Sequence, residues 1–139
     1  MQRIIKFSCT LSYIFLTLNS YASAIFGSSF AEEAILPPHE AFTISSPSLH
    51  TVQIKLAPGI YLYDDMTAVL TLDEKSIPEI SRPQPKIHND PYFGPRKIHR
   101  GIFIIKLENP PSAAILHYQG CADAGFCYPP MQTELSFSR

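Results

Sequence analysis

The chain has 139 residues, and its 11 basic and 12 acidic side chains give a formal net charge of −1 at pH 7. A near-neutral chain with no basic cluster argues against nucleic acid and anionic membrane as partners. All 13 prolines follow residue 24, and because proline interrupts the helix ladder, a mainly helical fold is excluded. The composition therefore predicts a single all-β domain with long, stiffened loops.

The first 24 residues have the pattern of an export signal. Arg3 and Lys6 precede a mostly apolar run over 7–18, and Ala22-Ser23-Ala24 offers an A-x-A cleavage site. The apolar run is short and polar for a membrane span, although an uncleaved anchor is the alternative. We expect a signal peptide over 1–24 that is cleaved near Ala24 and takes Cys9 with it, which leaves a mature domain over 25–139.

The mature part begins without a clear period. Residues 25–40 predict an irregular arm with a helical turn near 30–35. Val52, Ile54 and Leu56 then alternate with polar residues, the two-residue period of a half-buried strand. Further strands are predicted over 60–63, 68–72, 101–107, 113–119 and 131–137. About seven short strands in one small domain predict a two-sheet β-sandwich of immunoglobulin type.

Residues 76–100 differ from their surroundings. They hold five prolines and show little alternation. A loop of this length in a compact domain is usually functional or disordered. We therefore expect one long loop here. His39, His50, His88 and His99 have no evident partners at ligand spacing, so a solvated surface position is expected for each.

Cys121 and Cys127 are the only cysteines of the mature part, and five residues separate them. In an oxidising compartment two thiols this close are expected to pair. They end one predicted strand and begin the next, so they face each other across a hairpin. Opposed Cβ atoms lie about 4.5–5.5 Å apart there, a little beyond disulfide range, so closure needs local twist. Strain of that kind makes the bond easier to reduce.

The pair admits other interpretations. A ring of seven residues stabilises by only about 2–3 kcal/mol in the chain-entropy model, yet a plain hairpin staple remains open. The spacing is not C-x-x-C, and Asp123 between the sulfurs would disfavour a thiolate. A soft ion such as Cu(I) held by the thiols with His117 and Met131 is a further possibility, but the spacing matches no standard site.

Thirteen successive residues, from Tyr118 to Pro130, carry a resemblance to a known family. The segment YQGCADAGFCYPP resembles the active-site hairpin of the N-terminal periplasmic domain of the thiol:disulfide interchange protein DsbD. Gly59-Ile60-Tyr61-Leu62-Tyr63 is similar to its G-x-Y-L-Y strand, and Asp90-Pro91-Tyr92-Phe93-Gly94 to its aromatic cap loop. The resemblance covers nearly the whole mature chain.

The resemblance implies a periplasmic immunoglobulin-like domain that relays electrons by dithiol–disulfide exchange. Cys121 and Cys127 would be catalytic, with Cys127 forming the mixed disulfide and Cys121 resolving it. Tyr92 and Phe93 would act as a lid over the sulfurs, although ordinary packing on the core is the alternative. The full set implied for the cap loop and aromatic shield is Asp90, Tyr92, Phe93, Gly94, Tyr61, Tyr63 and Phe126.

The resemblance also implies thioredoxin-like partners. The donor would be of the DsbD C-terminal type, and the acceptors would be disulfide isomerases or cytochrome c maturation thioredoxins. No organic cofactor or metal is expected, because the sulfurs are the redox centre. The family protein continues into a membrane domain and a thioredoxin-like domain, whereas this sequence stops at Arg139. It is either a free-standing form served by a separate membrane electron transporter or a fragment. The rival class is a non-catalytic, secreted β-sandwich binding module with a structural disulfide.

Overall fold

The computed structural model describes residues 35–137, and the predictions for 1–34 lie outside them. The described part begins with α1 (Pro38–Ala41), a single turn with proline at its first position, where the missing N–H costs nothing. None of the helices among these residues is long and apolar enough to cross a membrane. The strands are β1 (Phe42–Ser48), β2 (Thr51–Leu56), β3 (Ile60–Tyr63), β4 (Ala68–Leu70), β5 (Glu79–Ser81), β6 (Lys86–Asp90), β7 (Gly94–Arg100), β8 (Ile102–Leu107), β9 (Ala113–Tyr118), β10 (Gly120–Ala122), β11 (Phe126–Cys127) and β12 (Met131–Ser136).

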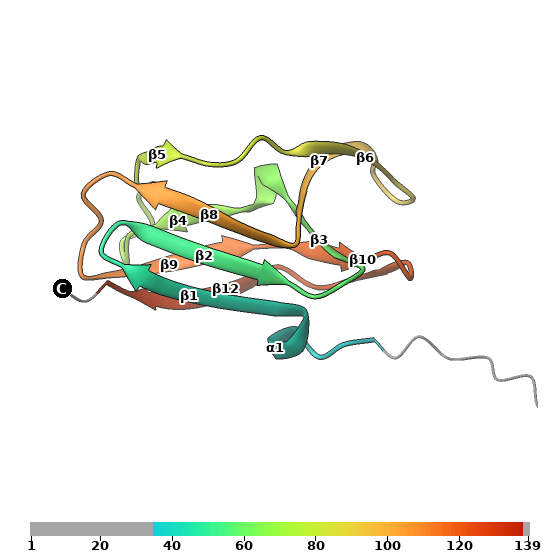
Figure 1. Cartoon of the computed structure of the whole chain (residues 1–139), viewed down its shortest axis with the longest axis horizontal. Coiled ribbons are helices and arrows are strands. Elements are labelled where there is room, and N and C mark those ends of the chain that lie inside the picture. The colour runs from blue at the N-terminus through green and yellow to red at the C-terminus, as the bar shows by residue number, and fades with distance from the viewer. Residues whose placement is uncertain (1–34, 138–139) are drawn as a thin grey trace, which may run out of the picture. The chain divides into compact units, whose positions relative to one another are not determined.

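The strands form two antiparallel layers (Figure 1). One layer has the order β1-β2-β8-β5. The other layer consists of two sheets, β12-β9-β4 and β11-β10-β3-β7-β6. They are continuous because β9 runs directly into β10 and β3 runs into β4, so that each of these two stretches of chain contributes a strand to both sheets. Only Gln119 separates β9 from β10, and its carbonyl accepts a hydrogen bond from the Tyr63 amide at 3.0 Å. The short 3₁₀ helix η1 (Asp64–Met66) makes the matching bend between β3 and β4.

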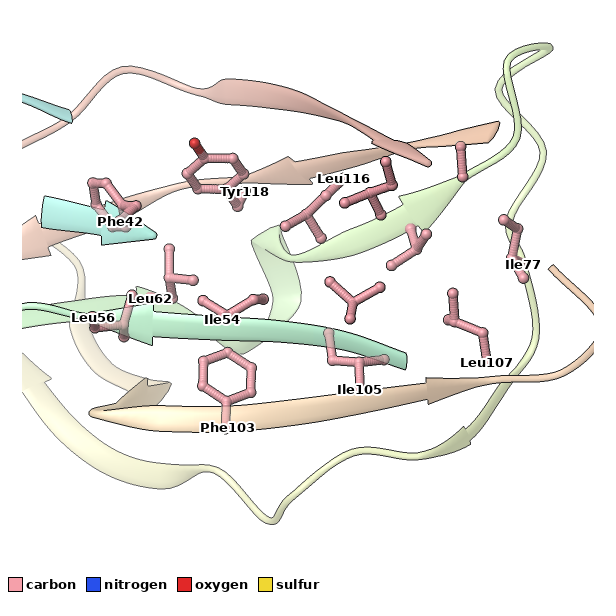
Figure 2. Close-up of a cluster of buried hydrophobic side chains, with 14 of the residues drawn as sticks. Phe42, Ile54, Leu56, Leu62, Ile77, Phe103, Ile105, Leu107, Leu116 and Tyr118 are labelled. Atoms are coloured by element: carbon pink, nitrogen blue, oxygen red, sulfur yellow. The ribbon is translucent and has the colours of Figure 1, made fainter. Parts of the chain in front are cut away.

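The core lies between the layers. Alternate residues of β2, β8 and β9 point inward, so Ile54, Ile105 and Leu116 are fully buried. Figure 2 shows the side chains of Phe103 and Ile105 facing those of Leu116 and Tyr118 across this space. Burying a large apolar side chain contributes about 1.5–3 kcal/mol. The all-β sandwich and the two-residue period predicted for Val52 to Leu56 are therefore confirmed.

The prediction of one long loop over 76–100 is wrong. This stretch contains β5, which pairs with β8, and the β6–β7 hairpin, which extends the sheet beyond β3. Proline is tolerated here because Pro95 lies in the part of β7 that pairs only with β6, while β3 pairs with Ile98 to Arg100. These strands bring the number in the described residues to twelve, more than the seven predicted.

The prediction of a solvated surface position is wrong for His99. It lies on β7, is only 5% exposed and stacks on Phe103 with ring centroids 4.5 Å apart. Its Nε2 lies 2.7 Å from Oδ1 of Asp64, and the guanidinium of Arg82 donates to the same carboxylate oxygen. The hydrogen bonds from these two side chains outweigh burial and lower the pKa of Asp64. A buried polar group needs such partners, and the distant Asp64 was not visible as a partner in the sequence pattern.

Candidate redox site

The hairpin of β10 and β11 places Cys121 opposite Cys127, as the sequence predicts, and a disulfide joins them. The Tyr128 amide donates to the Gly120 carbonyl at 3.0 Å, so the hydrogen bond flanks the cysteine pair. In an antiparallel ladder the residues between such bonds form the closer type of pair, with Cα atoms about 4.5 Å apart. The two Cα atoms here are 4.0 Å apart, close enough for the sulfurs to meet.

Two glycines allow this hairpin to form. Gly120 is buried against β3, and a Cβ atom at this position would lie 2.1 Å from the carbonyl oxygen of Tyr61. Only glycine permits the backbones to approach this closely. Gly125 has φ +84°, in the left-handed region, and turns the chain back toward Cys127. Gly120, just before the first cysteine, and Gly125, between the two, therefore set the geometry of the pair.

A buried tyrosine touches the inner sulfur. Cys121 is fully buried whereas Cys127 is half-buried. Cys121 pairs directly with Tyr61 on β3, so Tyr61 and Tyr63 lie on the same face of the sheet as the cysteine. The hydroxyl oxygen of Tyr63 lies 3.0 Å from Sγ of Cys121. The structure therefore places Tyr63 against the inner sulfur and Tyr61 opposite Cys121 on the neighbouring strand.

Asp90 organises the groups around the disulfide. Its Oδ2 accepts hydrogen bonds from the hydroxyls of Tyr61, at 2.7 Å, and Tyr63, at 2.6 Å. Its Oδ1 accepts the backbone amides of Tyr92, at 2.8 Å, and Phe93, at 3.0 Å. Burial opposes ionisation of this carboxyl, but the four hydrogen bonds outweigh it and lower the pKa of Asp90 to about 2. The carboxylate is therefore charged near neutral pH, and it links the cap loop to the two tyrosines.

The tyrosines remain neutral next to this carboxylate. Burial, followed by the hydrogen bond to Asp90, raises the pKa of Tyr61 to about 12. The same causes raise the pKa of Tyr63 still further. Both hydroxyls therefore keep their protons at physiological pH and act as hydrogen-bond donors.

The segment between β6 and β7 contacts both the tip of the cysteine hairpin and the tyrosine beside the inner sulfur. The exposed Tyr92 donates its hydroxyl hydrogen to the Gly125 carbonyl at the tip of the cysteine hairpin. Phe93 packs edge-on against Tyr63, with centroids 5.9 Å apart, and Gly94 takes φ +70° where the turn ends. In Figure 1 this loop projects at the same end of the domain as β10. We call residues 90–94 the cap loop.

Phe126 lies apart from this group. Adjacent residues of a strand point to opposite faces, and Phe126 packs edge-on against Tyr128, with centroids 5.0 Å apart. It is partly buried and packs against the main core, whereas Tyr61, Tyr63 and Cys121 form a second buried cluster with Ile98. The geometry thus brings together all the residues of the predicted set except Phe126.

Two arginines of β7 also border the site, and neither was predicted from the sequence. Arg100 forms a bidentate ion pair with Asp123, at 2.9 and 2.7 Å, and lies 4.8 Å above the Tyr61 ring. This pairing lowers the pKa of Asp123 and balances its charge, so the expected repulsion of a thiolate by Asp123 is reduced. Arg96 lies over Tyr63 and Phe93, 5.3 and 5.8 Å from the ring centroids. Arg96, Ile98 and Arg100 alternate with a period of two, the signal that identifies them once β7 is recognised as a strand.

Metal binding was the third interpretation of the cysteine pair. Within residues 35–137, no group of three or more His, Cys, Asp or Glu side chains has the arrangement needed to hold a metal ion. Both sulfurs are already engaged with each other.

Comparison with known proteins agrees with this geometry. The family model described as "Thiol:disulfide interchange protein DsbD, N-terminal" matches residues 32–138. The chain is 33% identical over 128 residues to the DsbD protein of Cronobacter sakazakii, covering 86% of this chain and 22% of that protein. It is 36% identical over 108 residues to DsbD 2 of Pseudomonas aeruginosa, covering 72% and 18%. The chain thus spans about a fifth of the length of these relatives.

Two solved structures have the same fold. The reduced N-terminal domain of Neisseria meningitidis DsbD superposes with a TM-score of 0.63 at 25% identity, covering 77% of this chain and 92% of that one. The DsbD N-terminal domain in complex with the PilB N-terminal domain, also from N. meningitidis, gives 0.59 at 25% identity, covering 74% and 87%. With the family match across residues 32–138, these similarities establish that the chain belongs to the family of DsbD N-terminal domains.

Proposed function

We propose that this domain performs thiol:disulfide interchange in the periplasm and that the Cys121–Cys127 pair is its redox centre. The observation that carries the proposal is the contact of Tyr63 with Cys121 inside a network centred on the buried Asp90. A hairpin staple has no need of a charged carboxylate and two neutral hydroxyls beside its sulfur. The hydroxyls do serve a bond that opens, because a tyrosine hydroxyl can donate its hydrogen to the sulfur that leaves. The carboxylate serves it by holding the two tyrosines and the cap loop in place.

The two cysteines have different tasks in this proposal. A thiolate of the electron donor attacks Sγ of Cys127, the more exposed sulfur, and the S–S bond breaks as a mixed disulfide forms. The electron pair of the broken bond goes to Cys121. A second thiol of the donor then attacks the mixed disulfide and releases Cys127, so the donor leaves oxidised and the domain gains two electrons and two protons. Transfer to an acceptor disulfide runs through the same steps in reverse, and there Cys121 resolves the mixed disulfide.

Tyr63 makes Cys121 a better leaving group. In the disulfide state the sulfur carries no proton, and the Tyr63 hydroxyl donates to Asp90. When Cys121 becomes a thiolate, the same hydroxyl oxygen is already 3.0 Å away and turns its hydrogen toward the sulfur. Tyr61 continues to donate to Asp90 at 2.7 Å, so the carboxylate keeps a partner during the exchange. Hydrogen bonds to charged groups are worth about 1.5–3 kcal/mol.

Thioredoxin-like domains are the proposed partners, both as electron donor and as acceptor. A domain that relays electrons must exchange with them and avoid other disulfides, and a cap loop that covers the pair until a partner docks provides this selectivity. The similar DsbD N-terminal domain from N. meningitidis forms a complex with the PilB N-terminal domain. On this proposal residues 1–24 are the signal peptide and 25–139 the mature redox domain.

Trapping of a partner tests the assignment. The Cys121→Ala variant leaves Cys127 as its reactive thiol, which is loaded with thionitrobenzoate. A reduced thioredoxin-like domain with one active-site cysteine should displace this coloured group and form a stable mixed disulfide. The matched Cys127→Ala variant, whose remaining thiol is buried, should react at least about 10-fold more slowly, because access is part of the exchange rate. Equal rates for the two variants would refute the assigned roles. Failure of both would favour a binding module with a structural bond.

A further inference from the structure

Arg96 joins three parts of the site that are distant in the sequence. Its guanidinium lies 5.3 Å from the centroid of Tyr63 on β3 and 5.8 Å from that of Phe93 in the cap loop. Its Nη2 donates to Oδ2 of Asp65, on η1, at 2.7 Å. Both ring distances are within the range for an attractive contact between a cation and an aromatic face.

The ion pair fixes the guanidinium where it meets the rings. The Arg96 side chain is 24% exposed, whereas that of Asp65 is 59% exposed. An exposed ion pair of this kind adds little stability of its own. Its effect is to orient a planar group that can stack on two aromatic rings, which a lysine ammonium cannot do.

Phe93 depends on few contacts for its position. It is 53% exposed, its ring meets Tyr63 edge-on and Arg96, and its amide donates to Asp90. Tyr63 in turn touches Cys121. Arg96 therefore acts on the cap loop and on the tyrosine beside the inner sulfur at the same time.

We propose that Arg96 is a positioning residue that holds the cap loop closed and thereby limits the rate at which thiols reach the Cys121–Cys127 disulfide. Loss of its side chain leaves Phe93 with one ring contact instead of two, so the loop opens more often. An exposed cation–aromatic contact corresponds to a change of about 2- to 5-fold in this equilibrium. The inference rests on the proposed function for its biological meaning, but the shielding itself is a property of this domain alone.

The test measures reaction with small reagents, without any protein partner. The rate of disulfide reduction by dithiothreitol is followed by alkylating the free thiols and measuring the mass of the protein by mass spectrometry. Arg96→Gln should be reduced about 2- to 5-fold faster than the original protein. Arg96→Lys keeps the charge and the reach to Asp65 but not the planar stacking, so its rate should lie between the two. Reoxidation by oxidised dithiothreitol should accelerate by the same factor, which leaves the reduction potential unchanged.

Lys97→Gln is the matched control. Lys97 is the next residue of β7, is exposed and points to the opposite face of the sheet, so its substitution should leave the rate unchanged. The midpoint of thermal unfolding confirms that each variant is folded. An unchanged rate for Arg96→Gln, an equal increase for Lys97→Gln, or a shifted reduction potential would each overturn the proposal. Because no partner is present in this test, a failure of electron relay to thioredoxin-like domains would not change its result. Likewise, an unchanged rate for Arg96→Gln would not argue against the electron relay.

Discussion

The Tyr63 hydroxyl oxygen lies 3.0 Å from Sγ of Cys121, and both side chains are fully buried. One hydroxyl has one hydrogen, and in the oxidised domain Asp90 accepts it. A thiolate at Cys121 creates a second acceptor at hydrogen-bond distance. The contact therefore couples the charge of the sulfur to the carboxylate that also holds the cap loop.

Replacing Tyr63 with phenylalanine should slow reduction of the disulfide by thiols by about 10-fold, because a hydrogen bond to the departing thiolate is lost. Tyr61→Phe is the matched control. It also removes one hydroxyl that donates to Oδ2 of Asp90, so it shares every loss except the contact with sulfur. Stopped-flow kinetics with a monothiol would measure both. Equal slowing in the two variants would show that the sulfur contact has no part in the reaction.

Asp90 should make the free energy of unfolding of the oxidised domain depend on pH in the acidic range. Its pKa is about 2 in the fold against an ordinary value of 3.8. Since the folded value is the lower one, the ionised carboxylate stabilises the fold above about pH 4, and this contribution of about 2 kcal/mol is lost as the pH falls toward 2. The difference in unfolding free energy between the original protein and Asp90→Asn should therefore shrink over this window. Urea titrations at several pH values measure it, and a constant difference would contradict the assignment.

Gly120 should tolerate no side chain. An added Cβ would meet the Tyr61 carbonyl at 2.1 Å, and this clash is with backbone. Gly120→Ala should therefore lower the free energy of unfolding by about 2–4 kcal/mol. Gly101→Ala is the control, because Gly101 has φ +69° but open space around it, so only the conformational cost of about 1–2 kcal/mol applies. Similar losses in the two variants would mean that β10 moves away from β3 easily.

The sequence predicts the sandwich and the cysteine hairpin because both depend on local patterns. Val52, Ile54 and Leu56 alternate with polar residues, and Cys121 and Cys127 flank a short turn, so their register follows from the chain itself. The β6–β7 hairpin could not be predicted because proline is normally excluded from the hydrogen-bond ladder of a central strand. Pro95 is tolerated in β7 only because it lies beyond the end of β3 and pairs with β6 alone. Arg96 and Arg100 were missed with it.

Other parts of the site depend on long-range contacts that no local pattern encodes. Asp90 meets Tyr61 and Tyr63 across 29 and 27 positions of the chain, and Tyr63 meets Cys121 across 58. Burial of His99 likewise depends on Asp64, which is 35 residues away. The resemblance to the DsbD N-terminal domain pointed to Asp90 and the two tyrosines as site residues. Only the structure shows that hydrogen bonds from both tyrosine hydroxyls to the Asp90 carboxylate join them.

The reduction potential of the Cys121–Cys127 pair is the measurement that tests the proposed function most directly. It is obtained by equilibrating the domain with reduced and oxidised dithiothreitol and quantifying its free thiols after alkylation. A bond that opens and re-forms in exchange should have a potential between about −120 and −270 mV, the span of proteins that perform this reaction. A value below about −300 mV is characteristic of structural disulfides and would contradict the proposed role.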